Sequence, residues 1–328
     1  MSLFRRRTRT SEGSRGLRIF VAADIHGSDV CWKKFLNAGK FYGVDALVLA
    51  GDLTGKALVP VIAEGPDRYR VKVMGRQRVV SKLELEEVER LIRFNGFYPY
   101  RCEPDEVASM REDEGAVTSA FQSAMRDQLE RWIALAEERL TGTGVRAFVM
   151  PGNDDEAFVS MMLDEAPILE NQDGRAIDIG GYSIVGQGWS NSTPWDTPRE
   201  KSEDDLEREL MELLDGVTNS RRVILNPHVP PHDTGLDSAP ELDDQLQVVA
   251  RSGQPNFVPV GSTGVRRVVE STQPLVSLSG HIHESKGVVD LAGTTCVNPG
   301  SEYNLGRLLG AIVELRDEEV RQVQLVTG

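Results

Sequence analysis

Short apolar runs separated by polar or amphipathic segments alternate along the first half of the chain. Three of them have the length and composition of buried β-strands. They are Leu17–Ala23, Ala46–Ala50 and Ala147–Met150. Ser28 or Asp29 can cap a helix that runs to about Phe41, between the first two strands. A strand, a helix and a strand at this spacing predict a parallel pair with a crossover connection.

The segment between the second and third strands has a different pattern. Val59–Ile62 and Arg68–Val73 predict a hairpin, and Leu83–Phe94 predicts a charged amphipathic helix. We interpret residues 56–114 as an insertion into a single domain that covers residues 17–328.

Closely spaced strand signals predominate in the second half, after a long helix within Gly115–Leu140. Turn residues separate these strands at short intervals, which is typical of antiparallel pairing. They are Ala176–Ile179, Tyr182–Gly186, Arg222–Asn226, Leu275–Ser279, Val288–Leu291, Thr294–Val297, Gly310–Leu315 and Val320–Leu325. The acidic run Glu200–Asp215 predicts an exposed helix, and Asp233–Arg267 predicts a long loop with some helix. The pattern as a whole predicts an α/β fold.

Composition and charge narrow the class of protein. The chain has 328 residues and 40% hydrophobic content, enough to bury a full core. Its net charge is -14, which disfavours stable binding to a nucleic-acid backbone. A small phosphorylated substrate held by cations is still compatible with this charge.

Three features of the sequence predict a cytoplasmic location. The Arg-rich start has no apolar run before Leu17, so we interpret residues 1–16 as a flexible tail and not as a signal peptide. No apolar stretch approaches the roughly 20 residues of a membrane helix, so no membrane partner is expected. The three cysteines, Cys31, Cys102 and Cys296, form no CxxC pair and fit buried thiols in a reducing compartment.

All five histidines follow a predicted buried strand within a few residues. They are His26, His228, His232, His281 and His283. Strand-end loops are where α/β enzymes carry their functional groups, and histidine is the commonest protein ligand of metal ions. A single histidine in such a place is more often a hydrogen-bonded structural residue, so the argument depends on the whole set.

Carboxylates, an amide and glycines accompany these histidines. The segments are Asp24-Ile25-His26, Gly51-Asp52, Gly152-Asn153-Asp154-Asp155, Asn226-Pro227-His228 and Gly280-His281-Ile282-His283. Residues two apart on an extended chain point the same way, so each Asp-x-His or His-x-His pair can meet one ion. A glycine beside a ligand lets the backbone approach closely.

This series, D-x-H, G-D, G-N, H and G-H-x-H, resembles that of the calcineurin-like metallophosphoesterase superfamily. The resemblance spans Asp24 to His283. The G-N-x-D pattern at residues 152–155 and the N-P-G-S turn at residues 298–301 are similar to those of its small bacterial and archaeal phosphodiesterase branch. The resemblance implies a four-layer αββα sandwich with two mixed sheets.

The resemblance also implies a two-metal centre. It assigns Asp24, His26 and His283 to one ion, Asn153, His228 and His281 to the other, and Asp52 to a bridging position. Such a carboxylate can hold two divalent ions roughly 3.5–4 Å apart, with a bridging hydroxide that attacks phosphorus in line. Mixed nitrogen and oxygen ligands suit Mn²⁺, Fe or Zn²⁺ better than Mg²⁺.

One departure from the family concerns the catalytic acid. Much of the family has histidine directly after Gly-Asn, where this chain has Asp154. General-acid assistance is typically worth about 10²–10⁴-fold, so its loss favours substrates with good leaving groups. Asp154 can replace the histidine only if it is protonated, which neighbouring cations oppose. The catalytic candidates are Asp52, Asn153 and Asp154.

Three other segments have two interpretations each. His232 either contacts the edge of the substrate or is a loop residue without a ligand role. The loop Gly186–Trp195 carries Trp189 and Trp195, which can stack on a nucleoside or pack the loop against the body. The Arg-rich start can bind phosphate or remain a solvated tail.

The function predicted first is hydrolysis of a small phosphoester. A diester is favoured because a doubly charged monoester needs extra cations and we find no basic loop close to the motifs. The second hypothesis is a non-catalytic or weakly active metal-binding scaffold, supported by the missing histidine. A nuclease is disfavoured by the net charge, although basic residues of the insertion could form a groove. These residues are Arg68, Arg70, Lys72, Arg76 and Arg78. The sequence leaves open whether the chain forms a homo-oligomer.

Overall fold

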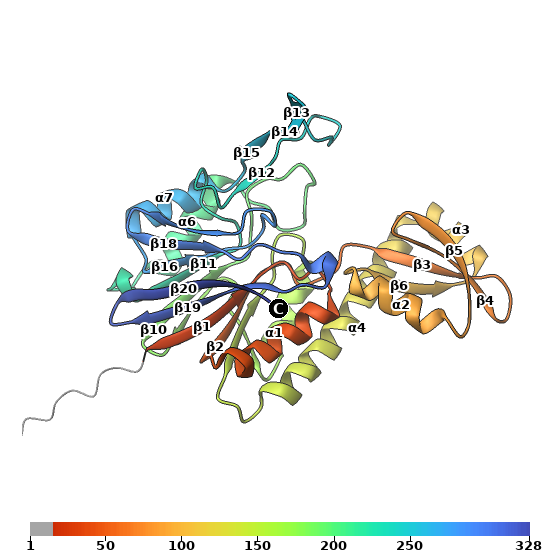
Figure 1. The fold of residues 1–328 in the computed structure, drawn as a ribbon, viewed down its shortest axis with the longest axis horizontal. Coiled ribbons are helices and arrows are strands. Elements are labelled where there is room, and N and C mark those ends of the chain that lie inside the picture. Colours follow the sequence, from red (N-terminus) through yellow and green to blue (C-terminus); the bar gives the residue numbers. More distant parts are fainter. Residues whose placement is uncertain (1–15) are drawn as a thin grey trace, which may run out of the picture.

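Two six-stranded sheets form the body of the protein (Figure 1). The structure is a computed structural model that describes residues 16–328, so the tail predicted for residues 1–16 lies outside the described residues except for Gly16. The first sheet has the order β20-β19-β1-β2-β7-β8. Its strands are β1 Leu17–Ala22, β2 Ala46–Ala50, β7 Arg146–Met150, β8 Leu169–Asn171, β19 Leu309–Arg316 and β20 Glu319–Thr327. Strands β1 and β2 pair in parallel, as the sequence predicted.

The second sheet has the order β17-β18-β16-β11-β10-β9. Its strands are β9 Arg175–Ile179, β10 Tyr182–Gln187, β11 Val223–Pro227, β16 Val276–Leu278, β17 Gly287–Leu291 and β18 Thr294–Asn298. The prediction of an antiparallel half was wrong, because β10, β11, β16 and β18 pair in parallel and only the outer strands are antiparallel. Parallel neighbours need long crossovers, and helices α6 (Glu203–Leu214) and α7 (Thr263–Thr272) lie in two of them.

The two sheets pack face to face through a shared cluster of buried side chains. Val48 and Phe148 of the first sheet belong to the same cluster as Ile224 and Val276 of the second. In β2, Leu47 and Leu49 lie on the opposite face of the sheet from Val48, because successive side chains of a strand alternate between the two faces. This alternation explains why β2 is apolar along its whole length.

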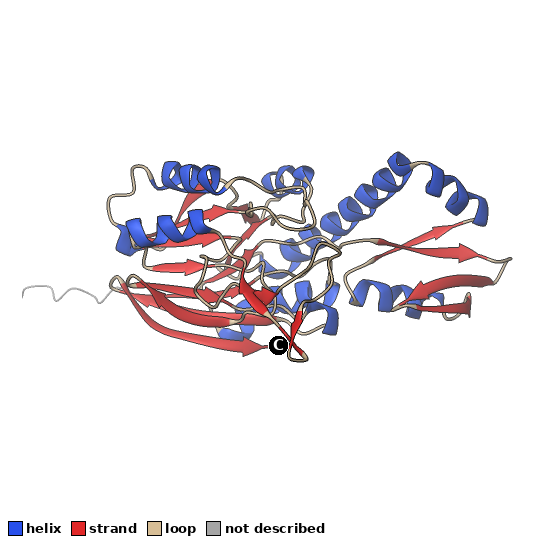
Figure 2. Ribbon diagram, turned by 90° about the horizontal axis from the view of Figure 1, so that it is seen from above, coloured by secondary structure: helices blue, strands red, loops and turns tan. Residues whose placement is uncertain are grey.

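Helices cover the outer faces of both sheets (Figure 2). Helices α1 (Asp29–Tyr42), α4 (Glu114–Leu140) and α5 (Ala157–Asp164) pack on the first sheet. Helices α6 and α7 pack on the second. Helix α6 was predicted to be exposed, but Leu206 and Leu210 are fully buried, since these residues share the face that meets the sheet. The arrangement is a mixed α/β fold with mixed sheets and flanking helices.

Residues 58–112 form a separate small sheet with its own helices, which extends to one side of the body (Figure 1). Its elements are β3 Leu58–Ala63, β4 Arg68–Val73, β5 Arg76–Ser81, α2 Leu85–Phe94, β6 Tyr98–Cys102 and α3 Pro104–Glu112. The predicted hairpin is present as β3 and β4, and the sheet order is β5-β4-β3-β6. Val61, Val71 and Ile92 lie in its own core cluster. We call residues 58–112 the insertion.

The polar segment Asp233–Arg267 is more ordered than predicted. It contains two short two-stranded sheets before α7 begins. The pairs are β12 Ser238–Pro240 with β15 Phe257–Pro259, and β13 Ala250–Arg251 with β14 Gln254–Pro255. Short 3₁₀ turns lie at Ser220–Arg222 and Tyr303–Leu305. Over residues 16–328, none of the helices combines the length and the apolar character needed to cross a membrane.

Candidate metal centre

The predicted ligands lie just after the carboxyl ends of five strands, three in the first sheet and two in the second. These strands are β1, β2, β7, β11 and β16. The carboxyl ends of parallel strands share one edge of a sheet, which is the usual place for a site in an α/β fold. Because the sheets pack face to face, the two edges bring side chains of both sheets together.

One group of candidate ligands contains Asp24, His26 and His283. Donor atoms from these three residues lie within 4.8 Å of one another. The Nε2 atoms of His26 and His283 are 3.0 Å apart, and His283 Nε2 is 3.9 Å from Asp24 Oδ1. Asp24 and His26 are fully buried. Two imidazole nitrogens and a carboxylate that converge in this way can hold a cation.

The second group contains His228, His281 and Asn153. The Oδ1 atom of Asn153 is 2.9 Å from His228 Nε2 and 2.8 Å from His281 Nδ1. The amide is oriented by its nitrogen, which donates to Thr197 Oγ1 at 2.9 Å. Its oxygen is therefore directed at the two imidazoles.

Asp52 lies between the two groups. Its Oδ2 atom is 3.6 Å from His26 Nε2 and 3.5 Å from His228 Nε2. Its Oδ1 atom accepts a hydrogen bond of 3.0 Å from the backbone N–H of Asp154. A single carboxylate oxygen is thus nearly equidistant from one histidine of each group.

Surrounding hydrogen bonds fix the direction of several ligands. The Ala50 carbonyl can only accept, so the contact of 2.7 Å with His228 Nδ1 places a proton on Nδ1 and directs Nε2 at the other ligands. Nε2 can bind a cation once it gives up its own proton. Both carboxylate oxygens of Asp24 accept the backbone N–H of His281 at 3.0 Å. These contacts orient a ligand from each sheet before any ion is bound.

The backbone at the ligands adopts an uncommon conformation. Asp24, His26, Asp52 and His281 have φ angles of 54°, 38°, 52° and 66°. Residues other than glycine rarely occupy this left-handed region, and such strain concentrates at functional sites. The strain is sustained because the turns between strands and ligands are held by hydrogen bonds across the site, such as Asp24 N–H to the Gly51 carbonyl at 3.0 Å.

The motif glycines leave room for ligands from other strands. A Cβ atom on Gly51 would lie 2.3 Å from His228 Nδ1, and one on Gly152 would lie 2.2 Å from Asp52 Oδ1. A Cβ on Gly280 would lie 2.6 Å from Asp24 Oδ2. Each glycine that precedes a ligand therefore makes space for a second ligand.

The pKa shifts describe a site in which His281 and His283 are neutral and His228 is charged. Burial works to lower the pKa of His228, but Asp52 outweighs it and raises the pKa to about 9. Burial lowers the pKa of His281 to about 3 and that of His283 to about 4. Burial raises the pKa of Asp24 to about 7. Burial also works to raise the pKa of Asp52, but His228 outweighs it and holds the pKa well below its usual range. Metal binding would displace the proton from Nε2 of His228, and neutral imidazoles with ionised or amide oxygens are the donor set that fits divalent transition metals.

Residues 298–301, the N-P-G-S turn, hold the ligand loops from outside. The side-chain nitrogen of Asn298 donates to the carbonyl oxygens of Gly280 and Ile282 at 3.3 and 3.0 Å. The hydroxyl of Ser301 donates to the carbonyl oxygen of Asp24 at 2.6 Å. The turn therefore joins the loop of His281 and His283 to the loop of Asp24.

Asp155, which was not among the predicted site residues, ties two ligand loops together. Its carboxylate accepts hydrogen bonds from the backbone N–H groups of Leu53, Thr54 and Gly152 at 2.8–2.9 Å. It also accepts the Thr54 hydroxyl at 2.6 Å. As the last residue of G-N-x-D, it could have been singled out from the sequence.

Asp154 lies at the rim of the site. Its Oδ2 atom is 2.8 Å from Lys56 Nζ and 3.7 Å from His26 Nδ1. With His26 and Asp52 it forms a third group of atoms close enough to hold an ion. Burial raises its pKa to about 6, and Lys56 acts against this shift. We found no basic loop close to the motifs and so overlooked Lys56, a single cation that follows Asp52 by four positions and contacts Asp154.

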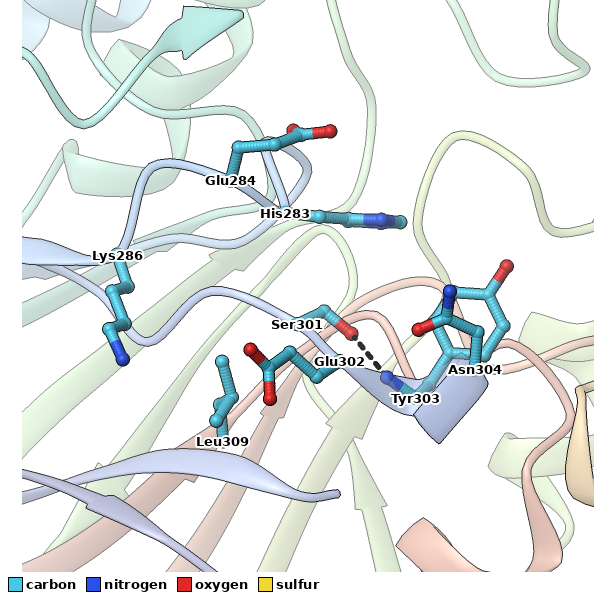
Figure 3. A pocket seen from close by; sticks show the side chains of 8 residues that line it. All are labelled: His283, Glu284, Lys286, Ser301, Glu302, Tyr303, Asn304 and Leu309. Carbon is cyan, nitrogen blue, oxygen red and sulfur yellow. Dashed lines mark hydrogen bonds between the residues drawn. The ribbon is translucent and has the colours of Figure 1, made fainter. Parts of the chain in front are cut away.

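Other residues near the site were also missed. The Tyr303 ring centroid is 4.7 Å from that of His26 and 5.8 Å from that of His283. Tyr303 lines a cavity of about 350 Å³ beside His283 (Figure 3). Thr197 was missed as the partner of Asn153. No local pattern in the sequence marks these residues, because their role depends on the packing of distant loops.

The remaining candidates lie at the margin or apart. Among the described residues, His232 belongs to none of the ligand groups, and its Nδ1 atom is 3.7 Å from Asp237 Oδ2. Trp189 packs against Arg199 and Lys201, with charged groups 4.6 and 4.0 Å from a ring centroid. Trp195 is 62% exposed, so its side chain is available for contact.

Comparisons with known proteins agree on the fold but do not give a family. No protein-family model matches the sequence. The chain is 30% identical over 152 residues to the uncharacterized protein MJ1162 of Methanocaldococcus jannaschii, a match that covers 46% of this chain and 62% of that protein. The chain thus spans less than two thirds of the curated relative.

Two crystal structures share the architecture over nearly the whole chain. TT1561 of Thermus thermophilus is similar with a TM-score of 0.53 and 15% identity, covering 96% of this chain and 99% of its own. A second crystal structure is similar with a TM-score of 0.55 and 17% identity, covering 95% and 99%. At these identities the likeness shows a related fold alone.

Proposed function

We propose that the protein is a metal-dependent phosphoesterase with the calcineurin-like fold. The observation that carries the proposal is the position of Asp52, whose Oδ2 atom lies 3.6 Å from His26 Nε2 and 3.5 Å from His228 Nε2. This geometry suits a carboxylate that bridges two ions. In the proposed assignment one ion is bound by Asp24, His26 and His283, and the other by Asn153, His228 and His281.

Divalent ions such as Mn²⁺, Fe or Zn²⁺ at these positions would supply an activated water and polarise the phosphoryl group. The residues of the chain have the complementary tasks. Asp52 fixes the spacing of the two ligand groups, and Asn153 is directed into the site by Thr197. Water adds to phosphorus as the ester P–O bond breaks, and the leaving oxygen takes up a proton.

Asp154 is better suited to holding Lys56 than to donating this proton. Its carboxylate lies 2.8 Å from Lys56 Nζ, a contact that favours the ionised form. Bound cations would favour that form further. We therefore assign Asp154 a positioning role, and the leaving oxygen would receive its proton from solvent, which favours substrates with good leaving groups.

The test combines metal analysis with turnover. We expect the purified protein to bind two equivalents of Mn²⁺ and to hydrolyse phosphoesters. Asp52→Ala should lower turnover by at least about 10²-fold, the loss typical of removing one preorganised electrostatic group. Asp127→Ala changes an exposed residue of α4 and serves as the control. A wild-type protein that binds no metal and hydrolyses neither monoesters nor diesters would contradict the proposal.

A non-catalytic scaffold is the second candidate, favoured by Asp154 at the position where much of the family has a histidine. Full metal occupancy without turnover of any ester would support it. The structure does not strengthen the nuclease hypothesis. The basic residues considered for it lie on β4 and β5, in the part of the insertion that extends from the body (Figure 1).

A further inference from the structure

Lys56 lies where the insertion joins the body, at the rim of the candidate metal centre. Its Nζ atom is 2.8 Å from Asp154 Oδ2, and 43% of its side chain is exposed. The ammonium group therefore contacts one carboxylate and remains open on another side. Three N–H donors are available on an ammonium group, so the contact with Asp154 leaves donors for a ligand.

The charge of Lys56 acts on ligands of both groups. Burial lowers the pKa of His283 in one group and of His281 in the other, and Lys56 lowers both further. Lys56 also works against the raised pKa of Asp24. Burial alone would lower the pKa of Lys56, but Asp154 and Asp52 outweigh it and raise the pKa. Lys56 is therefore a permanent cation at neutral pH, close to the place where an ester would bind.

The backbone that carries Lys56 is held from both sides. Asp155 accepts the N–H groups of Leu53 and Thr54, which fixes the loop to the body. The N–H of Gly55 donates to the Tyr98 hydroxyl of β6 at 2.8 Å, which fixes the loop to the insertion. A cation on a loop fixed in this way loses little freedom on binding a ligand.

We propose that Lys56 binds a terminal phosphoryl oxygen of the substrate, and that the site therefore favours phosphomonoesters over diesters. The inference rests on the proposed phosphoesterase function. A monoester dianion has three non-bridging oxygens and a diester has two. Two ions can neutralise two of these oxygens, and Lys56 supplies a positively charged donor for the third.

The cavity beside His283 is suited to the alcohol part of a monoester. It has a volume of about 350 Å³ and is lined mainly by polar side chains (Figure 3). They include Glu284, Lys286, Ser301, Glu302, Tyr303 and Asn304. Glu284 balances Lys286, and Glu302 is paired with Arg307 at 3.0 Å, so a second phosphate on this side would find no surplus of positive charge. A neutral, hydroxylated leaving group is the better match.

Phosphate binding tests the role of Lys56 without relying on turnover. Titration calorimetry of the Mn²⁺-loaded protein with inorganic phosphate should show an affinity for Lys56→Met that is about 10- to 100-fold weaker than wild type, the range expected for a lost charged hydrogen bond. Lys72→Met, an exposed lysine of β4, is the matched control and should change the affinity by less than about twofold. Lys56→Arg keeps the charge and should retain most of the affinity.

Turnover of two simple substrates then tests the preference. Lys56→Met should lower kcat/KM for p-nitrophenyl phosphate by about 10- to 100-fold and that for bis(p-nitrophenyl) phosphate by less than about threefold. Equal losses for both esters, or unchanged phosphate affinity in Lys56→Met, would overturn the assignment. If the wild type hydrolyses neither ester, the phosphoesterase proposal fails, and the calorimetric comparison still decides whether Lys56 binds phosphate.

Discussion

The Nδ1 atom of His228 lies 2.7 Å from the carbonyl oxygen of Ala50, the last residue of β2. The contact joins the two sheets, because His228 follows β11 of the second sheet. It also sets the imidazole tautomer, since a carbonyl oxygen can only accept a hydrogen bond. The Nε2 atom is thereby directed at Asn153 and Asp52.

Replacement of His228 should remove one ion. In His228→Ala the second ligand group loses a nitrogen donor whose direction is already fixed. We expect metal content to fall from about two Mn²⁺ per chain to about one, measured by elemental analysis after dialysis. His232→Ala is the control, because His232 belongs to none of the ligand groups of the described chain. Equal metal loss in the two variants would contradict the assignment.

Replacement of Asp155 should lower the stability of the folded protein, even in the absence of metal. The carboxylate is fully buried and accepts four hydrogen bonds, three from backbone N–H groups. Asp155→Asn puts an amide donor against some of these donors, and we expect a loss of about 2–4 kcal/mol in the free energy of unfolding. Urea denaturation of the metal-free protein measures it, with Asp127→Asn on α4 as the exposed comparison. An unfolding midpoint equal to wild type would show that these bonds add no net stability.

Asp52 leaves no room for a side chain at Gly152, so a larger residue there should disturb the metal centre. A Cβ atom at this position would lie 2.2 Å from Asp52 Oδ1 and 2.4 Å from the Asp52 backbone nitrogen. Gly152→Ala should therefore displace Asp52 and weaken Mn²⁺ binding by at least about 10-fold, measured by calorimetry. Gly115→Ala on α4 meets only a side-chain oxygen of Asp113, at 3.1 Å, and should bind Mn²⁺ normally. Normal binding by Gly152→Ala would contradict a tight position for Asp52.

The cysteine thiols should be unreactive in the folded protein. Cys31, Cys102 and Cys296 are all buried and free. Burial raises the pKa of all three, and that of Cys296 to about 12, so the reactive thiolate is scarce. A disulfide exchange reagent at pH 8 should modify fewer than about one thiol per chain, and all of them in urea. Rapid modification of the native protein would contradict the buried positions.

The sequence predicted the strands that carry the candidate ligands because the signals are local. An apolar run such as Ala46–Ala50 and the Gly51-Asp52 that follows it are adjacent in the chain, so strand and ligand can be recognised together. The structure brings the predicted groups together, with Asp52 between them. Which ions they bind stays a prediction.

The features that were missed depend on contacts between distant segments. Helix α7 was hidden in a polar segment, so the crossover from β11 to its parallel neighbour β16 was missed. The helix predicted between β10 and β11 was not interpreted as a crossover. The loop of Lys56 is held by Asp155 and by the bond from Gly55 to Tyr98, 43 residues further along the chain. Tyr303 contacts His26, although the two residues lie near opposite ends of the chain. Residue type and spacing along the chain do not predict which distant segments pack against each other.

The joint between the insertion and the body has a steric consequence. A Cβ atom on Gly96, at the end of α2, would lie 2.2 Å from the carbonyl oxygen of His26 and 2.9 Å from the Tyr303 ring. At so close an approach no side chain fits at position 96, so any larger residue there has to displace the backbone of His26 or the insertion itself. The way the insertion is joined to the body therefore depends on one hydrogen atom in place of a side chain.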